Sequence, residues 1–244
     1  MPKPEIFRFR DFNIQHSAST MKVGQDAVLL GALTKIENAG KILDIGTGCG
    51  IIALMLAQRS NADIDAIEID ENSATEAASN FQLSPWSDRL HAIHLSLADF
   101  VTISTQKYDL IVSNPPFFHR DLLPVSKKLQ MAKHATSLDF DSFIKGSKAL
   151  LKKNGRLNVI LPRTLMEVFT SKCLINGLFQ LSAIQIIPRT GRKPNRVILT
   201  FSDEKAENII SSFFTVRNEN GHYSQQYIDA TAGFHPPQYF TNQV

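Results

Sequence analysis

Three closely spaced glycines form the first stretch of the sequence that could do chemistry. Gly46, Gly48 and Gly50 lie in LDIGTGCG, between an apolar run typical of a buried strand and a helix-like segment. Because glycine has no Cβ, the backbone of such a turn can approach a ligand closely, and the following helix offers free N–H groups beside it. The turn lacks the Gly-Lys-Ser/Thr ending of a P-loop, which excludes that class of phosphate site. A glycine-rich turn alone can also be purely structural.

Two carboxylates extend this pattern. Asp44 precedes the glycines at the end of the first strand, and Glu68, in AIEID, lies at the end of the second. A carboxylate in the latter position can accept hydrogen bonds from both hydroxyls of a ribose. Asp70 is better placed to cap the next helix, and Cys49 is interpreted as a small loop residue because nothing near it would activate a thiol. The stretch therefore predicts a site for a nucleotide-like cofactor.

A rigid corner follows a later apolar run, Tyr108–Val112. It consists of Asn114, Pro115, Pro116 and Phe117. Proline cannot donate to a strand ladder, so the prolines end the strand, and the second one restricts the backbone before it and fixes the direction of its carbonyl. The corner presents an amide oxygen and a carbonyl oxygen beside a ring on which a planar base could stack. The alternative is a purely structural turn after a buried strand.

The spacing Asp-x-Gly-x-Gly-x-Gly resembles the first motif of class I S-adenosylmethionine-dependent methyltransferases. On that resemblance, Asp44 and the three glycines line the S-adenosylmethionine site, and Glu68 binds the ribose hydroxyls. Asp99, in LAD after the third strand, would accept a hydrogen bond from the adenine amino group of the cofactor. Asn-Pro-Pro followed by an aromatic residue resembles motif IV of the amino-methyltransferases, which methylate exocyclic amines of nucleobases or a glutamine side-chain amide. This second resemblance makes Asn114–Phe117 the catalytic corner and places Asn114 beside the cofactor.

Such a corner suits methyl transfer to an amine that is conjugated with a ring. The lone pair of that amine is delocalised, so the amine is a poor nucleophile. The Asn114 side-chain oxygen and the Pro115 carbonyl can hold its two hydrogens, which favours a pyramidal nitrogen with its lone pair aimed at the methyl group. Because the sulfonium is already a strong electrophile, we expect no metal ion and no catalytic histidine.

Segments outside the two motifs reduce the range of possible substrates. They resemble the tRNA1(Val) adenosine-37 N6-methyltransferase family over almost the whole chain. The segments are Met21–Ala32 (MKVGQDAVLLGA), SPW (84–86), ILP (160–162), RVILTFS (196–202) and HYSQQY (222–227). The resemblance implies transfer of a methyl group from S-adenosylmethionine to N6 of an adenosine in tRNA, with the anticodon stem-loop region as the RNA partner. The sequence departs from the family in having NPPF rather than the more frequent NPPY, and in a less apolar C-terminal segment.

Three alternatives remain open. NPPF is common in guanine-N2 methyltransferases that act on ribosomal RNA. Glutamine methyltransferases of release factors share the corner, but they usually carry NPPY and a separate N-terminal helical domain, which 39 residues cannot supply. A catalytically silent RNA-binding protein could keep the fold, although the presence of Asp44, Glu68 and Asn114 favours an enzyme.

Strand-like and helix-like segments alternate along the chain, which is typical of a parallel sheet with helices on both faces. The predicted strands are Ile42–Ile45, Ile64–Ile69, Leu90–Leu95, Tyr108–Val112, Arg156–Leu161, Leu181–Ile187 and Arg196–Phe201. The predicted helices are Gly50–Gln58, Glu71–Gln82, Asp139–Lys152, capped by Asn154-Gly155, and Thr164–Asn176, closed by Gly177. Only PRTGRKPN separates the last two strands, too short for a crossover helix, so they should form an antiparallel hairpin at one sheet edge.

The expected architecture is therefore α/β: a Rossmann-like class I methyltransferase domain over residues 40–244. Its seven-stranded, mostly parallel sheet has helices on both faces and an antiparallel last strand. Residues 1–39 form an N-terminal segment that closes over the cofactor site. Phe7, Phe9, Phe12 and Ile14 alternate within that segment, and they could equally form an edge strand on the core.

Basic residues near the predicted mouth of the site are candidates for RNA contact. They are Arg120, Lys127, Lys128, Lys133, Arg192 and Lys193. The first four lie in the segment 118–136, which follows the corner directly and carries Asp121 as its one acidic residue. They could hold phosphates with a salt-dependent affinity, or they could form a solvated face.

The composition of the chain limits the classes of protein to which it can belong. A chain of 244 residues with 43% hydrophobic content can bury the core of one domain. A net charge of +3 is too small to demonstrate a nucleic-acid partner. Two cysteines exclude a disulfide framework and suggest reduced thiols. The N-terminus has no signal-peptide core, and no apolar run could span a membrane. We therefore expect a cytoplasmic enzyme that acts as a monomer.

Overall fold

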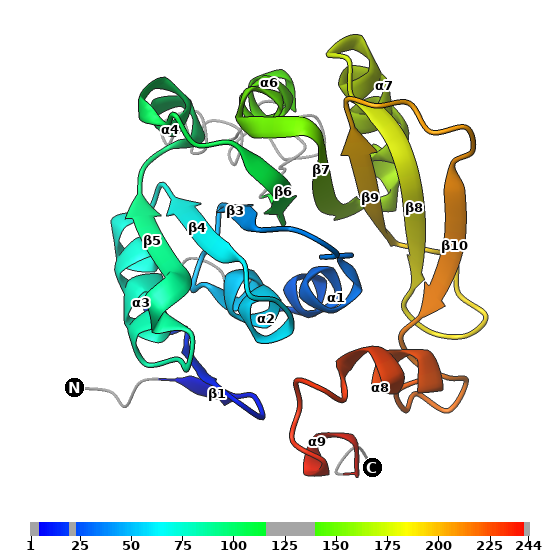
Figure 1. Cartoon of the computed structure of the whole chain (residues 1–244). Coiled ribbons are helices and arrows are strands. Elements are labelled where there is room, and N and C mark those ends of the chain that lie inside the picture. Colours follow the sequence, from blue (N-terminus) through cyan, green and yellow to red (C-terminus); the bar gives the residue numbers. More distant parts are fainter. Residues whose placement is uncertain (1–4, 20–22, 116–139, 242–244) are drawn as a thin grey trace, which may run out of the picture.

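The computed structural model describes residues 5–19, 23–115 and 140–241. Its main strands are β3 (Lys41–Ile45), β4 (Asp63–Glu68), β5 (Leu90–His94), β6 (Tyr108–Ser113), β7 (Leu151–Pro162), β8 (Phe179–Ile187), β9 (Arg196–Ser202) and β10 (Ile210–Thr215). Together they form one sheet with the order β10-β8-β9-β7-β6-β3-β4-β5 (Figure 1). β9 runs antiparallel to β7 and β8, and every other neighbouring pair is parallel. The predicted fold class is confirmed.

Helices cover both faces of this sheet (Figure 1). They are α1 (Gln25–Leu33), α2 (Ile51–Arg59), α3 (Glu71–Gln82), α4 (Leu97–Ile103), α6 (Phe140–Leu150), α7 (Met166–Ile175), α8 (Gln225–Thr231) and α9 (Gln238–Thr241), with 3-10 turns at Ser87–Arg89 and Arg163–Leu165. Successive side chains of a strand point to opposite faces. Ile42 therefore belongs to the core cluster that includes residues of α1, α2 and α3, whereas Leu43 and Ile45 belong to the cluster that includes residues of α4, α6 and α7. In the part of the chain described, no helix has the length and hydropathy needed to cross a bilayer.

The sheet has one strand more than the seven predicted. β8 and β9 form the predicted antiparallel pair, but β10 lies outside β8 and pairs with it in parallel, with Ile210 opposite Ser182. The antiparallel β9 returns the chain to the edge where β8 began. The next strand can therefore run parallel to β8 without a crossover helix, which the alternation of helices and strands did not indicate.

The boundary between α6 and β7 also differs from the prediction. α6 ends at Leu150 and β7 begins at Leu151, so Asn154-Gly155 lies inside a strand rather than at a helix end. Asn154 has a φ of 61°, and the pairing of β6 with β7 shifts register between Tyr108 and Leu110. A Cβ on Gly155 would lie 2.9 Å from the Tyr108 carbonyl oxygen. Asn154 and Gly155 therefore allow β7 to depart from regular pairing with β6 at this point. Gly177, by contrast, ends α7 with a φ of 72°, as predicted.

The N-terminal segment forms a hairpin of its own. β1 (Ile6–Arg8) and β2 (Asn13–Gln15) pair with Phe7 opposite Ile14, separate from the main sheet. Phe9, Phe12 and Ile14 are buried. The alternating apolar residues therefore pack on the core, which was one of the two interpretations of this segment. The segment packs on the core as two short strands that pair with each other, because the chain turns between Phe9 and Phe12.

Candidate active site

Strand register brings the three motifs to one level of the sheet. Ile45, the last residue of β3, pairs with Ile67 of β4 and with Ser113 of β6. The next residue on each strand is Gly46, Glu68 or Asn114, so these three lie side by side at the carboxyl edge. The Ser113 hydroxyl donates to the Ile45 carbonyl at 2.7 Å, which ties the base of the corner to the base of the glycine loop.

The three glycines do not have the same role. All have positive φ: 71° at Gly46, 57° at Gly48 and 87° at Gly50. A Cβ on Gly46 or Gly48 would meet nothing within 4 Å, so this part of the loop faces open space. A Cβ on Gly50 would lie 2.5 Å from the ring of Phe81 on α3. Contact of the Gly46 and Gly48 backbone with a ligand stays a prediction, for which this open space leaves room, whereas Gly50 begins α2 and allows α3 to pack closely.

Glu68 holds the loop in place. One carboxylate oxygen accepts the Gly48 N–H at 2.9 Å, and the other accepts the N–H groups of Ile69 and Asp70 at 2.9 and 3.0 Å. The residue is buried at the end of β4. A carboxylate has about four acceptor positions, so about one remains for a ligand beside these three bonds. Binding of two ribose hydroxyls to Glu68 stays a prediction, and it would compete with the loop amides.

Asp44 is a fully buried carboxylate in the same place. Its Oδ2 accepts the Thr47 hydroxyl at 2.6 Å, and among the residues described its Oδ1 has no hydrogen-bond partner. Burial raises the pKa of Asp44 to about 7; the Thr47 hydroxyl and the Ala53 amide partly offset this effect, and the charge of Glu68 adds to it. An unpaired buried carboxylate oxygen is costly unless a ligand provides a donor or a positive charge.

The corner is described only in part. Asn114 is half-buried and Pro115 is buried, directly after β6. Within the described chain, no hydrogen bond engages the Asn114 side chain, and its role toward a ligand stays a prediction. Pro116 and Phe117 lie outside the described residues, and their catalytic roles stay predictions.

Asp99 lies in the first turn of α4, and it is exposed. Its carboxylate accepts the Ser96 hydroxyl at 2.6 Å, while the Ser96 hydroxyl oxygen accepts the Asp99 N–H at 3.1 Å. This pair caps the helix. Contact of Asp99 with an adenine ring stays a prediction, and such contact would require its carboxylate to turn away from Ser96.

Two of the six basic candidates can be placed. Arg192 and Lys193 are exposed in the loop between β8 and β9, which lies at the same carboxyl edge as the glycine loop. Arg196, the first residue of β9, is paired with Asp26 of α1 at 2.8 Å. Arg120, Lys127, Lys128 and Lys133 lie outside the described residues.

Other polar side chains at this edge carry weaker sequence signals. Thr47, inside the glycine motif, was missed although its position three residues after Asp44 suits a turn hydrogen bond. Asp70 caps α3 as expected, since its carboxylate accepts the Ser73 N–H at 2.8 Å. Burial raises the pKa of the Cys49 thiol to about 11, so this residue is not activated as a nucleophile. In the ranges described, His, Cys, Asp and Glu side chains form no metal-binding group of three.

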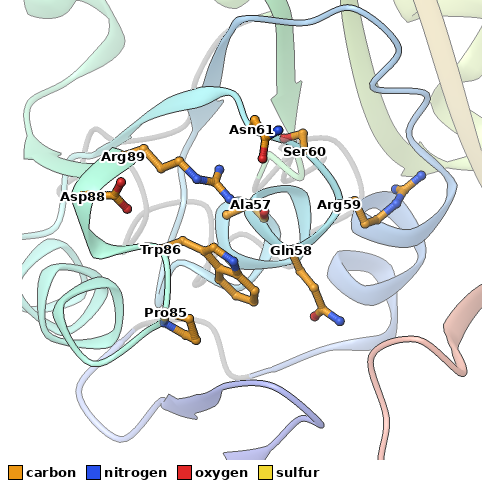
Figure 2. Close-up of a pocket in the computed structure, with 9 residues that line it drawn as sticks. All are labelled: Ala57, Gln58, Arg59, Ser60, Asn61, Pro85, Trp86, Asp88 and Arg89. Carbon is orange, nitrogen blue, oxygen red and sulfur yellow. Dashed lines mark hydrogen bonds between the residues drawn. The ribbon is translucent and has the colours of Figure 1, made fainter.

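A separate hollow of about 490 Å³ lies at the opposite edge of the sheet (Figure 2). Residues 57–61 come from the end of α2 and residues 85–89 from the turn after α3, far along both helices from the glycine loop. Arg89 donates to the carbonyls of Ala57 and Ala62 at 2.5 and 2.9 Å. It therefore caps the carboxyl end of α2, and the hollow is not part of the candidate site.

Comparison with known proteins agrees with this geometry. The family model for the methyltransferase small domain matches residues 16–183. A tRNA1(Val) (adenine(37)-N6)-methyltransferase of Flavobacterium psychrophilum is 39% identical over 94% of this chain and 99% of its own length. Proteins of the same name from Bacteroides fragilis and Glaesserella parasuis are 37% and 39% identical; each match covers 94% of this chain and 97% or 96% of the relative.

Solved structures share the fold at lower identity. A predicted O-methyltransferase from Agrobacterium tumefaciens is 20% identical, covers 86% of this chain and 96% of its own, and gives a TM-score of 0.65. Pyrococcus horikoshii TYW2 in complex with MeSAdo is 16% identical, covers 82% and 71% of the two chains, and gives a TM-score of 0.56. At these identities the similarity concerns the fold alone.

Proposed function

Because the chain belongs to the tRNA1(Val) (adenine(37)-N6)-methyltransferases within the methyltransferase small domain family, we propose that it methylates N6 of adenosine 37 in tRNA1(Val). The methyl donor is S-adenosylmethionine. The observation that carries the proposal is the register of β3 and β6, which places Asn114 level with Gly46. The corner is thereby beside the glycine loop, as transfer from a bound cofactor to a bound base requires.

The residues at this edge fit the cofactor. Gly46 and Gly48 leave open space where a side chain would stand. The unpaired Oδ1 of Asp44 suits the positive charge that the amino-acid part of S-adenosylmethionine carries. Glu68 keeps acceptor capacity for a ribose hydroxyl. When bound, S-adenosylmethionine supplies an electrophilic methyl group on its sulfonium.

Asn114 and Pro115 act on the base. The Asn114 amide oxygen and the Pro115 carbonyl accept the two hydrogens of the adenine amino group. These acceptors draw the nitrogen out of conjugation, so its lone pair becomes available in the direction of the methyl group. As the new N–C bond forms, the bond from the methyl carbon to sulfur would break and S-adenosylhomocysteine would leave, and one amino hydrogen would then be lost as a proton to solvent. The rigid backbone after β6 holds both acceptors in place before the base arrives.

The RNA is held by basic residues around this edge. Arg192 and Lys193 are exposed there, and they would contact phosphates of the anticodon stem-loop. The four basic residues between 120 and 133 are proposed to act with them. Nucleotide 37 lies in a single-stranded loop, so its base can be extruded into a pocket at a cost of a few kcal/mol or less.

The test is the identity of the methylated nucleoside. Purified protein is incubated with S-adenosylmethionine that carries a labelled methyl group and with unmodified tRNA1(Val). The tRNA is then digested to nucleosides and to fragments for mass spectrometry. We expect labelled N6-methyladenosine in the fragment that contains position 37. Labelled N2-methylguanosine would instead support the guanine-N2 alternative, and cofactor binding without transfer to tRNA or ribosomal RNA would support the silent RNA-binding protein.

A further inference from the structure

The N-terminal segment is fastened to one face of α3. Asn80 and Glu76 are one helical turn apart, so they share a face. The Asn80 side chain accepts the Gln15 N–H at 2.9 Å and donates to the Gln15 carbonyl at 2.8 Å. The two oxygens of Glu76 accept the N–H groups of Ala18 and Ser19 at 2.9 and 2.8 Å. Four hydrogen bonds therefore hold residues 15–19 by their backbone alone.

The same side chains reach the glycine loop. The Asn80 amide nitrogen also donates to the Cys49 carbonyl at 2.8 Å. Cys49 stands between Gly48, whose N–H bonds Glu68, and Gly50, which begins α2. One buried amide group thus links the N-terminal segment, α3 and the loop proposed to hold the cofactor.

The chemistry of this link requires an asparagine. Asn80 is 1% exposed, and it uses one acceptor and two donors for the three bonds. An aspartate would lack both donors and turn a charge toward two carbonyl oxygens. Glu76 is 8% exposed, and peptide dipoles of the N-terminal segment stabilise its charge. The bonds from these two side chains to Gln15, Ala18 and Ser19 exist only while residues 15–19 stay docked.

We infer that Glu76 and Asn80 are positioning residues that couple docking of residues 13–19 to the conformation of the glycine loop. Undocking of the segment would take these partners from a buried carboxylate and a buried amide. Asn80 would then be free to turn, and its bond to the Cys49 carbonyl would lose the two Gln15 contacts that fix the orientation of the amide. Cofactor affinity would therefore depend on docking. Coupling between two sites is reciprocal, so a bound cofactor would hold the segment in place. The inference rests on the proposed function only for the identity of the ligand.

The reciprocal effect can be measured without any substitution. Hydrogen exchange of the peptide that spans Asn13–Ser19 is followed with and without S-adenosylhomocysteine. We expect slower exchange of the amides of Gln15, Ala18 and Ser19 when the ligand is bound. The intrinsic fluorescence of Trp86 gives a second signal of docking. Trp86 is the one tryptophan of the sequence, and its ring centroid lies 5.8 Å from that of Phe12 in the hairpin.

Substitutions test the forward effect. Asn80→Ala and Glu76→Gln should each raise the dissociation constant of S-adenosylhomocysteine, measured by calorimetry, by about tenfold or more. They should raise KM for S-adenosylmethionine and leave kcat at saturating cofactor within about twofold. Ser79→Ala and Thr75→Ala are matched controls, because they change exposed residues of α3 next to the two positions, and both should behave as the parent. Should Asn80→Ala fail to fold, the milder Glu76→Gln and the exchange experiment decide.

Two results would overturn the inference. One is an unchanged ligand affinity in folded variants, and the other is exchange at residues 13–19 that does not respond to ligand. Either result in a parent protein that binds S-adenosylhomocysteine and methylates tRNA would leave the proposed function standing. A parent that does not bind the ligand at all would refute the proposed function and this coupling together.

Discussion

At the scale of single residues, a few side chains at the carboxyl edge of the sheet define the site. Their spacing in the sequence predicted that Asp44, Glu68 and Asn114 would meet there, and strand register brings the last two to one level with Gly46. The partners of these side chains were not predictable. Glu68 accepts three loop N–H groups. The backbone N–H groups of a turn folded over a strand end need acceptors, and the nearby carboxylate provides them. Gly50, predicted to face a ligand, is needed for packing against Phe81.

Asp44 should make stability depend on pH. Its pKa is raised to about 7 from an ordinary value of 3.8, so the folded protein holds a proton that the unfolded chain releases between these values. Stability should therefore fall as pH rises through this interval and level off above about pH 7. In Asp44→Asn this fall should be absent, and the slope of melting temperature against pH should flatten in the ligand-free protein. Parallel curves for parent and variant would show that Asp44 does not titrate in this way.

Asn114 should act on turnover rather than on cofactor binding. Removing one of the two acceptors in Asn114→Ala should lower the single-turnover rate by about a hundredfold or more, by analogy with removal of one oxyanion-hole donor. Affinity for S-adenosylhomocysteine should stay near that of the parent. Gln106→Ala, just before the opposite end of β6, should keep both properties. A near-normal rate in Asn114→Ala would mean that the corner is only a structural turn.

At the scale of elements, the hydrophobic pattern predicted a strand or helix correctly where local sequence signals fix its bounds. α3 has the predicted bounds, because Asp70 caps its start and its buried residues follow helical spacing. Prediction failed where tertiary pairing decided the outcome. The segment Leu151–Gly155 continues the polarity of α6 in the sequence, yet it forms the start of β7 because β6 offers it a ladder. β10 could not be found from alternation, because its place depends on the direction of β9.

The loop between β8 and β9 should contribute to RNA affinity. Arg192→Gln combined with Lys193→Gln should weaken tRNA binding and reduce the slope of log affinity against log salt by about 0.7–0.9 for each phosphate that the protein no longer neutralises. Cofactor affinity should not change. Lys153→Gln combined with Lys205→Gln removes two exposed charges at the other edge of the sheet and is the matched control. An unchanged salt slope in the loop variant would assign Arg192 and Lys193 to a solvated face.

At the scale of the whole molecule, the N-terminal hairpin packs against the segment that carries Phe234, His235 and Tyr239. His235 stacks on Tyr239 with ring centroids 3.7 Å apart and on Phe9 of the hairpin at 5.3 Å. The Arg10 N–H donates to the Phe234 carbonyl at 2.6 Å. Residues from opposite ends of the sequence meet here, which no local pattern could predict. The hairpin that Asn80 and Glu76 fasten to α3 is thus also supported from the C-terminal side.

The central claim is that this chain methylates N6 of adenosine 37. NPPF could serve an adenine or a guanine, since either amine has two hydrogens for Asn114 and Pro115 to accept. The rest of the base must decide, through polar groups left paired or unpaired when it is buried. The three relatives compared above, which match over nearly their whole length, are all named as adenine-37 enzymes.

The most direct measurement therefore uses two unmodified tRNA1(Val) transcripts that differ only in having adenosine or guanosine at position 37. Each is incubated with the protein and labelled S-adenosylmethionine, then digested and mapped by mass spectrometry. The proposed function predicts N6-methyladenosine at position 37 of the first transcript and no transfer to the second. N2-methylguanosine in either transcript, or methylation of ribosomal RNA alone, would contradict it.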